Sequence, residues 1–285
     1  MGLFFSRESF EDGEDGEDGA EHVKRPPLCC GGGMQALNWA ERIDGYLAAV
    51  AESELNMKAR SAGEYKPAEF SQEGRTIPVE EKSSPWPNGQ VVWMDQGADA
   101  GLPHTRPPYY ICLPTSIDLE SPSGLATLKH ERIHVSQRLH EDTWKKIYAD
   151  AWNFVPVLPP ELPERVRRRV RINPDTCRAP VYAWTSGSAS GSGSAGGHWI
   201  PYALFNSSFD PKLTDTTIHW WHVESANLYS VPPPGWSDFF GRNLPSSAHE
   251  HPNELAAYIL SSTQSSPARS ALEKYLDILP RTETW

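Results

Sequence analysis

The chain has 285 residues and a mass of 31.8 kDa, which is enough to bury one hydrophobic core, and its formal net charge is −11. This acidic balance argues against a nucleic-acid partner, because phosphate binding requires a concentrated basic surface. No apolar run reaches 18 residues, so no membrane-spanning helix is expected. The four cysteines fit neither a disulfide framework nor a metal-binding pair, and a reducing compartment is the default.

Residues 1–33 are predicted to form a disordered acidic tail. Residues 11–19 repeat the triplet Glu-Asp-Gly, and such charged, glycine-rich sequence cannot bury apolar area. No secretory signal is expected, because the short apolar start gives way at once to charged residues. The start does match the pattern for N-myristoylation at Gly2. We therefore expect a cytoplasmic protein that binds a membrane surface peripherally only if Gly2 is acylated.

The folded domain is predicted to extend from residue 34 to residue 285. Apolar residues recur at helical spacing between Met34 and Met57. A stretch rich in proline and glycine follows, and two short apolar segments at 91–94 and 109–113 are predicted to be strands of a small sheet. Because the chain contains 26 prolines and 11 tryptophans, we expect much irregular chain packed by large aromatic side chains.

The clearest helix is predicted from Leu125 to about Tyr148. This segment contains no proline and follows a Ser-Gly pair that suits a helix start. Its apolar stripe consists of Leu128, Val135 and Leu139. The helix is therefore expected to bury one face and to leave the opposite face open.

The centre of this predicted helix carries the sequence His130-Glu131-Arg132-Ile133-His134. Residues four apart on a helix lie on one face about one turn apart, so the two imidazoles can bind the same metal ion. Glu131 lies beside them, where a carboxylate can act as a general base. The alternative interpretation is a pair of surface histidines without a metal.

This His-Glu-x-x-His pattern resembles the zinc-binding motif of the zincin metallopeptidases. The resemblance implies an α+β, zincin-like domain with a small sheet, an active-site helix and a second ligand-bearing helix. It also implies a Zn²⁺ cofactor that activates water, with Glu131 as the general base for hydrolysis of peptide bonds. Peptides or proteins would be the substrates, and a strand beside the cleft could hold an extended peptide by backbone pairing.

A third protein ligand is required, and His140 is one candidate. With His140 the motif reads H-E-x-x-H-x-x-Q-x-x-H, which resembles the metzincin signature except that Gln137 replaces a glycine. That glycine lets the metzincin chain turn sharply, whereas Gln137 favours continuation of the helix. Metzincins also carry a methionine after the motif, and all four methionines here precede it. Both departures count against His140.

Glu254 is the second candidate, and we favour it. It belongs to the sequence His251-Pro252-Asn253-Glu254, which is similar to the second-helix motif of gluzincins, where an Asn-Glu pair supplies the third ligand. Pro252 suits the first turn of a helix predicted over residues 250–262, and a further helix is predicted over 267–279. The interval after the first motif is longer than in compact gluzincins. Tyr258 also replaces the aspartate that orients a zinc-bound histidine in many gluzincins, so another group must do so here.

Three residues near Glu254 have weaker claims to a role. Tyr258 is a candidate donor for stabilising the oxyanion. His249 and His251 flank a glutamate and are reserve metal ligands. His219 and His222 lie in a predicted strand whose alternation sends them to opposite faces, so a shared metal site is improbable there.

Four further segments of the sequence carry predictions of their own. Residues 185–197 have the Gly/Ser composition of a flexible linker and are interpreted as a surface loop within one domain. The basic run at 165–171 is predicted to be a solvated helix face. Residues 173–175 are predicted to form a turn that could contact a substrate. His104 precedes the second predicted strand and could also reach a substrate.

Two other functions share these residues. A non-catalytic zinc-containing binding or interaction protein on the same fold would hold the ion for structure, and its closed site would need a fourth protein ligand such as His251. A hydrolase acting on a non-peptide amide would use every predicted ligand.

Overall fold

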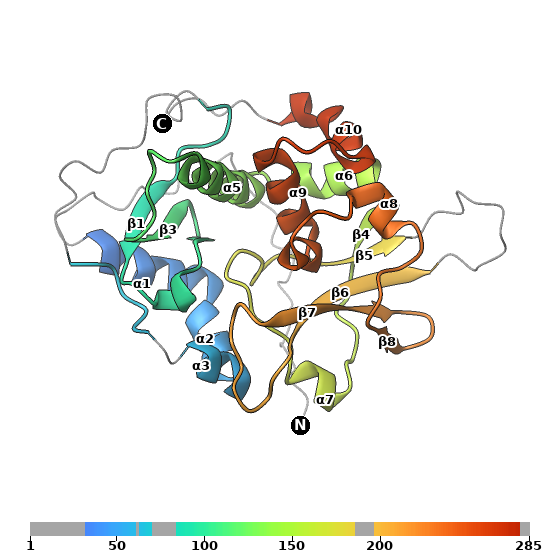
Figure 1. Cartoon of the computed structure of the whole chain (residues 1–285), viewed down its shortest axis with the longest axis horizontal. Coiled ribbons are helices and arrows are strands. Elements are labelled where there is room, and N and C mark those ends of the chain that lie inside the picture. The colour runs from blue at the N-terminus through green and yellow to red at the C-terminus, as the bar shows by residue number, and fades with distance from the viewer. Residues whose placement is uncertain (1–31, 61–62, 70–83, 186–196, 280–285) are drawn as a thin grey trace, which may run out of the picture. The chain divides into compact units, whose positions relative to one another are not determined.

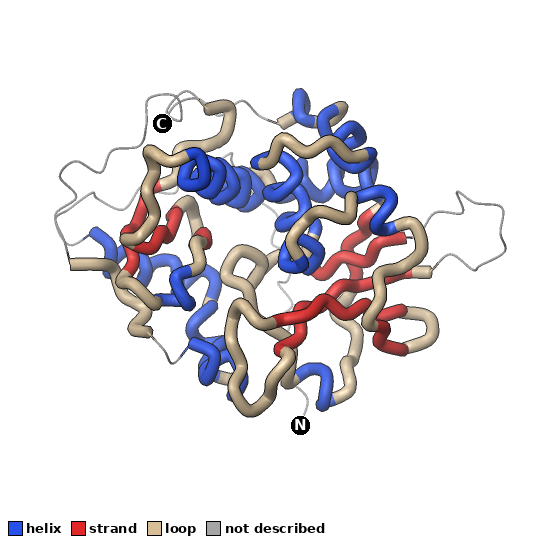
Figure 2. The backbone as a smooth tube through the Cα atoms, in the orientation of Figure 1, coloured by secondary structure: helices blue, strands red, loops and turns tan. Residues whose placement is uncertain are grey.

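The fold combines helices with two small β-sheets, an architecture compatible with the predicted α+β class (Figure 2). The computed structural model describes residues 32–60, 63–69, 84–185 and 197–279, all of which except Gly32 belong to one unit, Gly33–Trp285. The predicted acidic tail up to residue 31, with Gly2, and the predicted Gly/Ser loop from 186 to 196 lie outside the described residues. None of the described helices is long and apolar enough to cross a membrane.

The first sheet has the strand order β1-β3-β2. Strand β1 (Gln90–Met94) runs parallel to β3 (Tyr110–Pro114), and β2 (His104–Arg106) runs antiparallel to β3. The two predicted strands are β1 and β3, so the predicted small sheet is confirmed. Alternate side chains of these strands pack in different clusters, one with helix α1 (Gly32–Asp44) and one with helix α5 (Pro122–Leu139). One face of the first sheet therefore packs against the buried side of α5.

The predicted helical segment between Met34 and Met57 is three helices. These are α1 (Gly32–Asp44), α2 (Tyr46–Ala51) and α3 (Glu54–Arg60). Gly45 separates the first two with a φ of 59°, a left-handed conformation that ends α1 and that glycine adopts without strain.

The helix predicted from Leu125 to Tyr148 is broken at His140. Helix α5 spans Pro122–Leu139 and helix α6 spans Glu141–Trp152, and His140 has a non-helical backbone at φ −129°, ψ 42°. The two acidic residues that open α6 favour a new helix start, because negative charge is stabilising at a helix N-terminus. Leu128 and Val135 are buried as predicted, but Leu139 at the end of α5 is 39% exposed.

The second sheet is an antiparallel meander that the sequence pattern did not predict as a sheet. Its strands follow chain order: β4 (Phe154–Val157), β5 (Val181–Thr185), β6 (His198–Phe205), β7 (Thr216–His222) and β8 (Asn227–Tyr229). Only the region of β7 was predicted to be a strand. Pro156 and Pro201 interrupt β4 and β6, and proline inside a segment argues against a strand.

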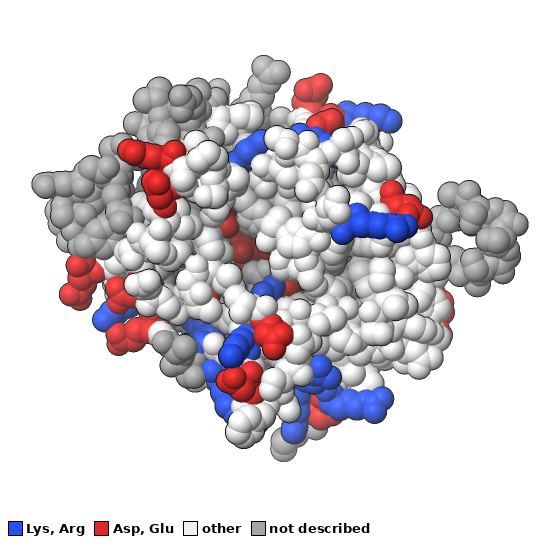
Figure 3. Space-filling view, in the orientation of Figure 1, with Lys and Arg blue, Asp and Glu red and all other residues white. Residues whose placement is uncertain are grey.

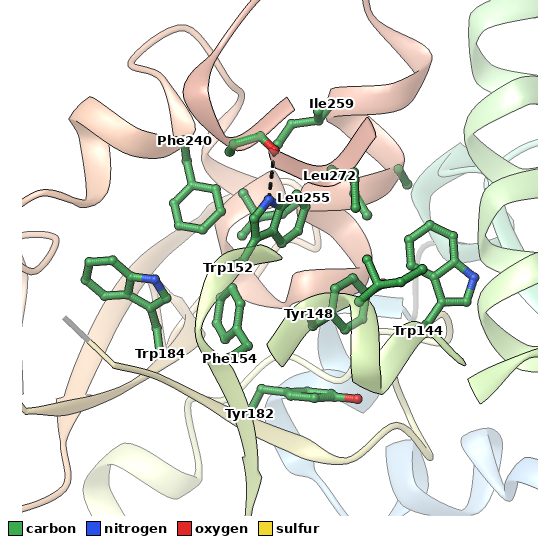
Figure 4. Packing of buried hydrophobic residues seen from close by; sticks show 14 of the residues in the cluster. Trp144, Tyr148, Trp152, Phe154, Tyr182, Trp184, Phe240, Leu255, Ile259 and Leu272 are labelled. Atoms are coloured by element: carbon green, nitrogen blue, oxygen red, sulfur yellow. Dashed lines mark hydrogen bonds between the residues drawn. The ribbon is translucent and has the colours of Figure 1, made fainter. Parts of the chain in front are cut away.

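An aromatic core joins α6 to the second sheet and to the C-terminal helices (Figure 4). Trp144, Tyr148 and Trp152 from α6 pack in one cluster with Phe154 and Tyr182. The indole of Trp152 also donates a hydrogen bond of 2.9 Å to the carbonyl of Ala268. Burying each such side chain is worth about 1.5–3 kcal/mol, so the cluster holds this half of the fold firmly. Packing by large aromatic side chains is confirmed.

The C-terminal helices complete the fold. They are α8 (Trp236–Phe240), the 3₁₀ helix η2 (Ser246–Glu250), α9 (Pro252–Ser261), α10 (Pro267–Glu273) and the 3₁₀ helix η3 (Leu276–Ile278). The two predicted C-terminal helices correspond to α9 and α10, although α10 ends before residue 279. Helix α9 packs beside α5 (Figure 1), and this contact positions the candidate site.

Candidate metal centre

Three predicted ligands meet where α5 packs against α9. The Nε2 atoms of His130 and His134 lie 3.0 Å apart. The carboxylate of Glu254 places Oε2 at 3.4 Å from Nε2 of His130 and Oε1 at 3.5 Å from Nε2 of His134. The structure thus brings one nitrogen from each histidine and both oxygens of Glu254 around a single point.

These spacings suit a tetrahedral metal ion. Zinc bonds of about 2.0–2.2 Å at tetrahedral angles separate neighbouring ligand atoms by about 3.3–3.5 Å. The three measured separations of 3.0, 3.4 and 3.5 Å lie close to that range. The three residues could therefore hold a metal ion of this size.

The start of α9 is built so that Glu254 faces the histidines. His251 caps the helix, since its Nδ1 accepts a hydrogen bond of 3.1 Å from the backbone N–H of Asn253. Pro252 occupies the first turn, as predicted, because that position needs no N–H donor. Glu254 is 5% exposed in the same turn.

Gln137 is the group that orients His134. Its amide nitrogen donates hydrogen bonds of 2.9 Å to the backbone carbonyl of Asn253 and to the hydroxyl of Tyr148. A carbonyl can only accept, so the amide oxygen of Gln137 must face Nδ1 of His134, which lies 2.7 Å away. The neutral form of His134 therefore carries its proton on Nδ1, which leaves the lone pair of Nε2 for a metal ion. Gln137, which stands in place of the metzincin glycine, thus orients a histidine as the aspartate does in many gluzincins.

We expect Gln137→Met to weaken zinc binding by about 10- to 100-fold, because loss of a hydrogen-bond partner behind a metal ligand has effects of that size. Competition with a chromogenic chelator measures this affinity. Gln264→Met, at an exposed position outside the site, is the matched control. An unchanged zinc affinity in Gln137→Met would contradict the assigned role.

Glu131 lies beside the three ligands with one oxygen unused. Its side chain is buried, and Oε2 has no hydrogen-bond partner among the described residues. Burial, together with the nearby charge of Asp175, raises the pKa of Glu131 well above its usual value. A buried carboxylate without a partner is costly, and such a group at a cleft is a marker of function.

The charges around the site favour a bound cation. Burial opposes protonation of His134, but Asp175 and Glu254 outweigh this effect and raise the pKa of His134 to about 10. Burial would likewise raise the pKa of Glu254, yet His134 and His130 hold it well below its usual value. The neighbouring ionisable groups are four carboxylates and two guanidinium groups, Glu131, Asp175, Glu250, Glu254, Arg138 and Arg171. Their formal charge is two negative units when all four carboxylates are ionised, and either a proton on His134 or a bound metal cation offsets part of this charge.

The loop at residues 171–175 contributes groups that sequence reasoning assigned to a substrate-binding turn and not to the metal site. Asn173 donates hydrogen bonds to Oε1 of Glu254, at 2.8 Å, and to Glu250. Arg171 pairs with Glu250 at 2.5 Å and is little exposed, so the predicted solvated basic face holds for Arg165 but not for Arg171. The available signal was the Asn-Pro-Asp turn, because polar loop residues often carry function.

The predicted reserve ligands lie elsewhere. His251 is fully engaged, because Nδ1 caps α9 and Nε2 lies 3.1 Å from the carbonyl of Pro180. His249 accepts a hydrogen bond of 3.0 Å from the indole of Trp236. His140 is not part of the His130–His134–Glu254 group. These three residues are therefore not placed to complete the metal site.

His249 is expected to make the fold sensitive to mild acid. Burial lowers its pKa to about 4, whereas an unfolded histidine titrates near about 6.5. Because the folded pKa is the lower one, neutral His249 contributes its stability above about pH 6.5 and loses it as the pH falls towards 4. Between pH 7.5 and 5.0, His249→Gln should lose about 2 kcal/mol less unfolding free energy than the wild type, measured by urea denaturation. The exposed His198→Gln is the control, and equal losses in all three proteins would refute this expectation.

The metal site opens onto a cleft of about 410 Å³. Figure 3 shows a hollow on this face of the molecule with acidic side chains inside it. His130, Glu131 and Glu254 line the cleft, and so does Tyr258, whose ring packs edge-on against His130 at 4.5 Å between centroids. The Tyr258 hydroxyl lies 3.2 Å from the hydroxyl of Ser247. A volume of this size suits a small ligand or a short peptide segment.

Strand β2, at the edge of its sheet, does not offer a free backbone to a peptide at Thr105. The N–H of Thr105 donates to Asp175 at 2.7 Å, and its carbonyl accepts from Arg138 at 3.2 Å. Thr105 therefore has no free backbone group for a peptide, and pairing of a substrate with a strand beside the cleft stays a prediction. His104 lines the cleft, as predicted, but both of its ring nitrogens have protein partners.

Comparison of the chain with protein-family models, with curated proteins and with solved structures finds no match.

Proposed function

We propose that the protein is a zinc-dependent peptidase of the zincin type, with His130, His134 and Glu254 as zinc ligands. The observation that carries this proposal is a pair of histidine nitrogens 3.0 Å apart, each 3.4–3.5 Å from one carboxylate oxygen of Glu254, beside an unpartnered buried oxygen of Glu131. His130, Glu131 and Glu254 line a cleft, and the buried His134 lies beside His130 and Glu254.

The donor set favours zinc over other common metal ions. Two imidazole nitrogens and one carboxylate are typical of zinc, whereas magnesium and calcium prefer oxygen ligands alone. Three protein ligands leave a fourth position open, which is the arrangement of catalytic zinc sites. The hydrogen bonds of His251 support an open site, because they occupy the residue that would have closed it.

The residues divide the work of hydrolysis among them. When bound, zinc would lower the pKa of water and polarise the scissile carbonyl. Glu131 would take the proton of the attacking water through Oε2, and the raised pKa of its carboxyl suits it to pass that proton on to the leaving amine. The hydroxyl of Tyr258 would donate a hydrogen bond to the substrate oxygen on which negative charge develops. Gln137 would keep His134 in its ligating tautomer.

Zinc content and hydrolysis of peptides test this function. The purified full-length protein should contain one zinc ion per chain, measured by elemental mass spectrometry. It should cleave members of a broad peptide library, and a chelator should stop cleavage until zinc is restored. Bound zinc without cleavage of any peptide would favour the non-catalytic binding protein, and cleavage of simple amides alone would favour the non-peptide hydrolase. Absence of metal would exclude all three zinc proteins.

A further inference from the structure

A second unpartnered carboxylate oxygen belongs to Asp99, a residue that lines the same cleft. Asp99 is 3% exposed, and its Oδ1 accepts hydrogen bonds from Tyr46, at 3.2 Å, and from Arg60. Its Oδ2 has no hydrogen-bond partner among the described residues. Half of this buried carboxylate is therefore held in place by the protein while the other half is unused.

His104, the second basic residue beside Asp99 after Arg60, makes no hydrogen bond to Oδ2. Its Nδ1 lies 3.0 Å from the carbonyl of Leu102, so Nδ1 carries the proton. Its Nε2 lies 2.8 Å from the hydroxyl of Tyr65, which accepts from Arg106 and can give its own proton to Nε2. His104 is thus an acceptor at Nε2, which is 3.7 Å from Oδ2 of Asp99. This separation is too long for a hydrogen bond.

The backbone around Asp99 is held in an unfavourable conformation. Asp99 and Ala100 have φ values of 47° and 56°, and Gly97 and Gly101 on either side are also positive at 100° and 72°. Left-handed backbone costs free energy for a residue with a side chain, and such strain tends to be kept where it serves a site. Here the strained turn places an aspartate in the wall of the cleft.

The charges around Asp99 leave room for one more cation. Asp99 forms an ion pair with Arg60, and Tyr46 links it to Asp44, which shares Arg106 with Glu41. These two guanidinium groups and three carboxylates form one hydrogen-bonded network. Its formal charge is therefore one negative unit. A substrate group that brings one positive charge and an N–H donor would balance this charge and satisfy Oδ2 at once.

We propose that Asp99 determines specificity, by accepting a hydrogen bond from an ammonium or guanidinium group of the peptide that the cleft binds. This inference rests on the proposed peptidase function for the identity of the ligand. The positively charged group could be a lysine or arginine side chain or the amino terminus of the peptide. Both present the same N–H donors, and a binding experiment can tell them apart.

Short peptide hydroxamates are suitable probes, because the hydroxamate binds zinc at one end while the peptide extends along the cleft. We would compare compounds of one to three residues in pairs, in which one member carries lysine and the other norleucine at the same position. Each compound would be prepared with a free and with an acetylated amino terminus. Isothermal titration to the zinc-loaded full-length protein measures their affinities. A charge-assisted hydrogen bond should favour one lysine position, or the free terminus, by about 10- to 100-fold.

Asp99→Asn is the informative variant. Asparagine tolerates the left-handed backbone, and its oxygen can keep the contacts of Oδ1 with Tyr46 and Arg60. The amide N–H₂ then replaces Oδ2 and cannot accept a hydrogen bond, so the preference for the charged ligand should disappear. Asp95→Asn, in the same segment but outside the lining of the cleft, should retain the preference.

The outcomes separate this inference from the proposed function. Equal binding of lysine and norleucine compounds at every position, or a preference that survives Asp99→Asn, would overturn the role of Asp99. If no hydroxamate binds, the zinc peptidase proposal fails instead, and n-butylguanidinium then tests Asp99 without zinc. Its binding, followed by NMR, should be at least about 10-fold weaker in Asp99→Asn than in the wild type, and equal binding or none to either protein would refute the inference.

Discussion

Glu131→Gln is expected to lower kcat by about 10²- to 10⁴-fold, the usual contribution of a positioned general base. The amide has nearly the shape of the carboxylate but cannot take a proton from water. Zinc should remain bound at one ion per chain, because Glu131 is not one of the three ligands that surround the proposed ion. Steady-state hydrolysis of a cleaved library peptide, with zinc content measured on the same sample, tests both statements.

The melting temperature of Glu131→Gln shows whether a loss of activity comes from loss of the general base or from loss of the fold. Because Oε2 of Glu131 is buried without a partner and burial raises the pKa of this carboxyl, ionisation of Glu131 costs folding free energy at neutral pH. A neutral amide should leave the melting temperature equal to that of the wild type or higher. Glu141→Gln, at an exposed position at the start of α6, is the control and should keep full activity. Full activity in Glu131→Gln would eliminate this residue as the base.

Removal of the metal is expected to lower the melting temperature by about 8–16 °C. A ligand present at about 1,000 times its Kd stabilises the folded state by about 4 kcal/mol, and each kcal/mol shifts the melting temperature by about 2–4 °C in a domain of this size. Differential scanning calorimetry with added zinc and with a chelator measures the difference.

Substitution of a ligand should abolish that difference. His134→Ala removes a nitrogen donor whose side chain is 1% exposed, so zinc should no longer shift the melting temperature. His198→Ala removes a histidine that is 45% exposed and outside the cleft, and its zinc response should match that of the wild type. A wild-type melting temperature insensitive to zinc and chelator alike would count against the metal centre.

The sequence predicted the candidate site better than the surrounding fold, because helical spacing alone places His130 and His134 on one face. The Asn-Glu pair then indicated the third residue through its likeness to gluzincins. The role of Gln137 in orienting His134 could not be predicted from the local sequence. Its effect depends on the carbonyl of Asn253 and the hydroxyl of Tyr148, and these contacts cross between helices that are distant in sequence.

Other features could not be predicted because they depend on tertiary contacts. The break at His140 occurs in a segment that lacks glycine and proline. Helix α6 packs in the aromatic core, whereas α5 contributes Ile133 to that core and places Leu128 and Val135 in a separate cluster with the first sheet. The strands of the second sheet contain prolines and pair through residues far apart in the chain. Asp99 occupies a left-handed turn that its own residue type favours only weakly.

The hydrogen bond from Gln137 to Asn253 would couple metal binding at the proposed site to the contact between two helices. If α9 moved away from α5, the site would lose Glu254, and at the same moment Gln137 would lose the carbonyl that fixes its orientation. The proton of neutral His134 would then no longer be fixed on Nδ1, so Nε2 would no longer be the nitrogen that is always free to bind the metal. Zinc release and undocking of α9 should therefore behave as one cooperative event, in which amide hydrogens of α9 become exchangeable as soon as the ion leaves.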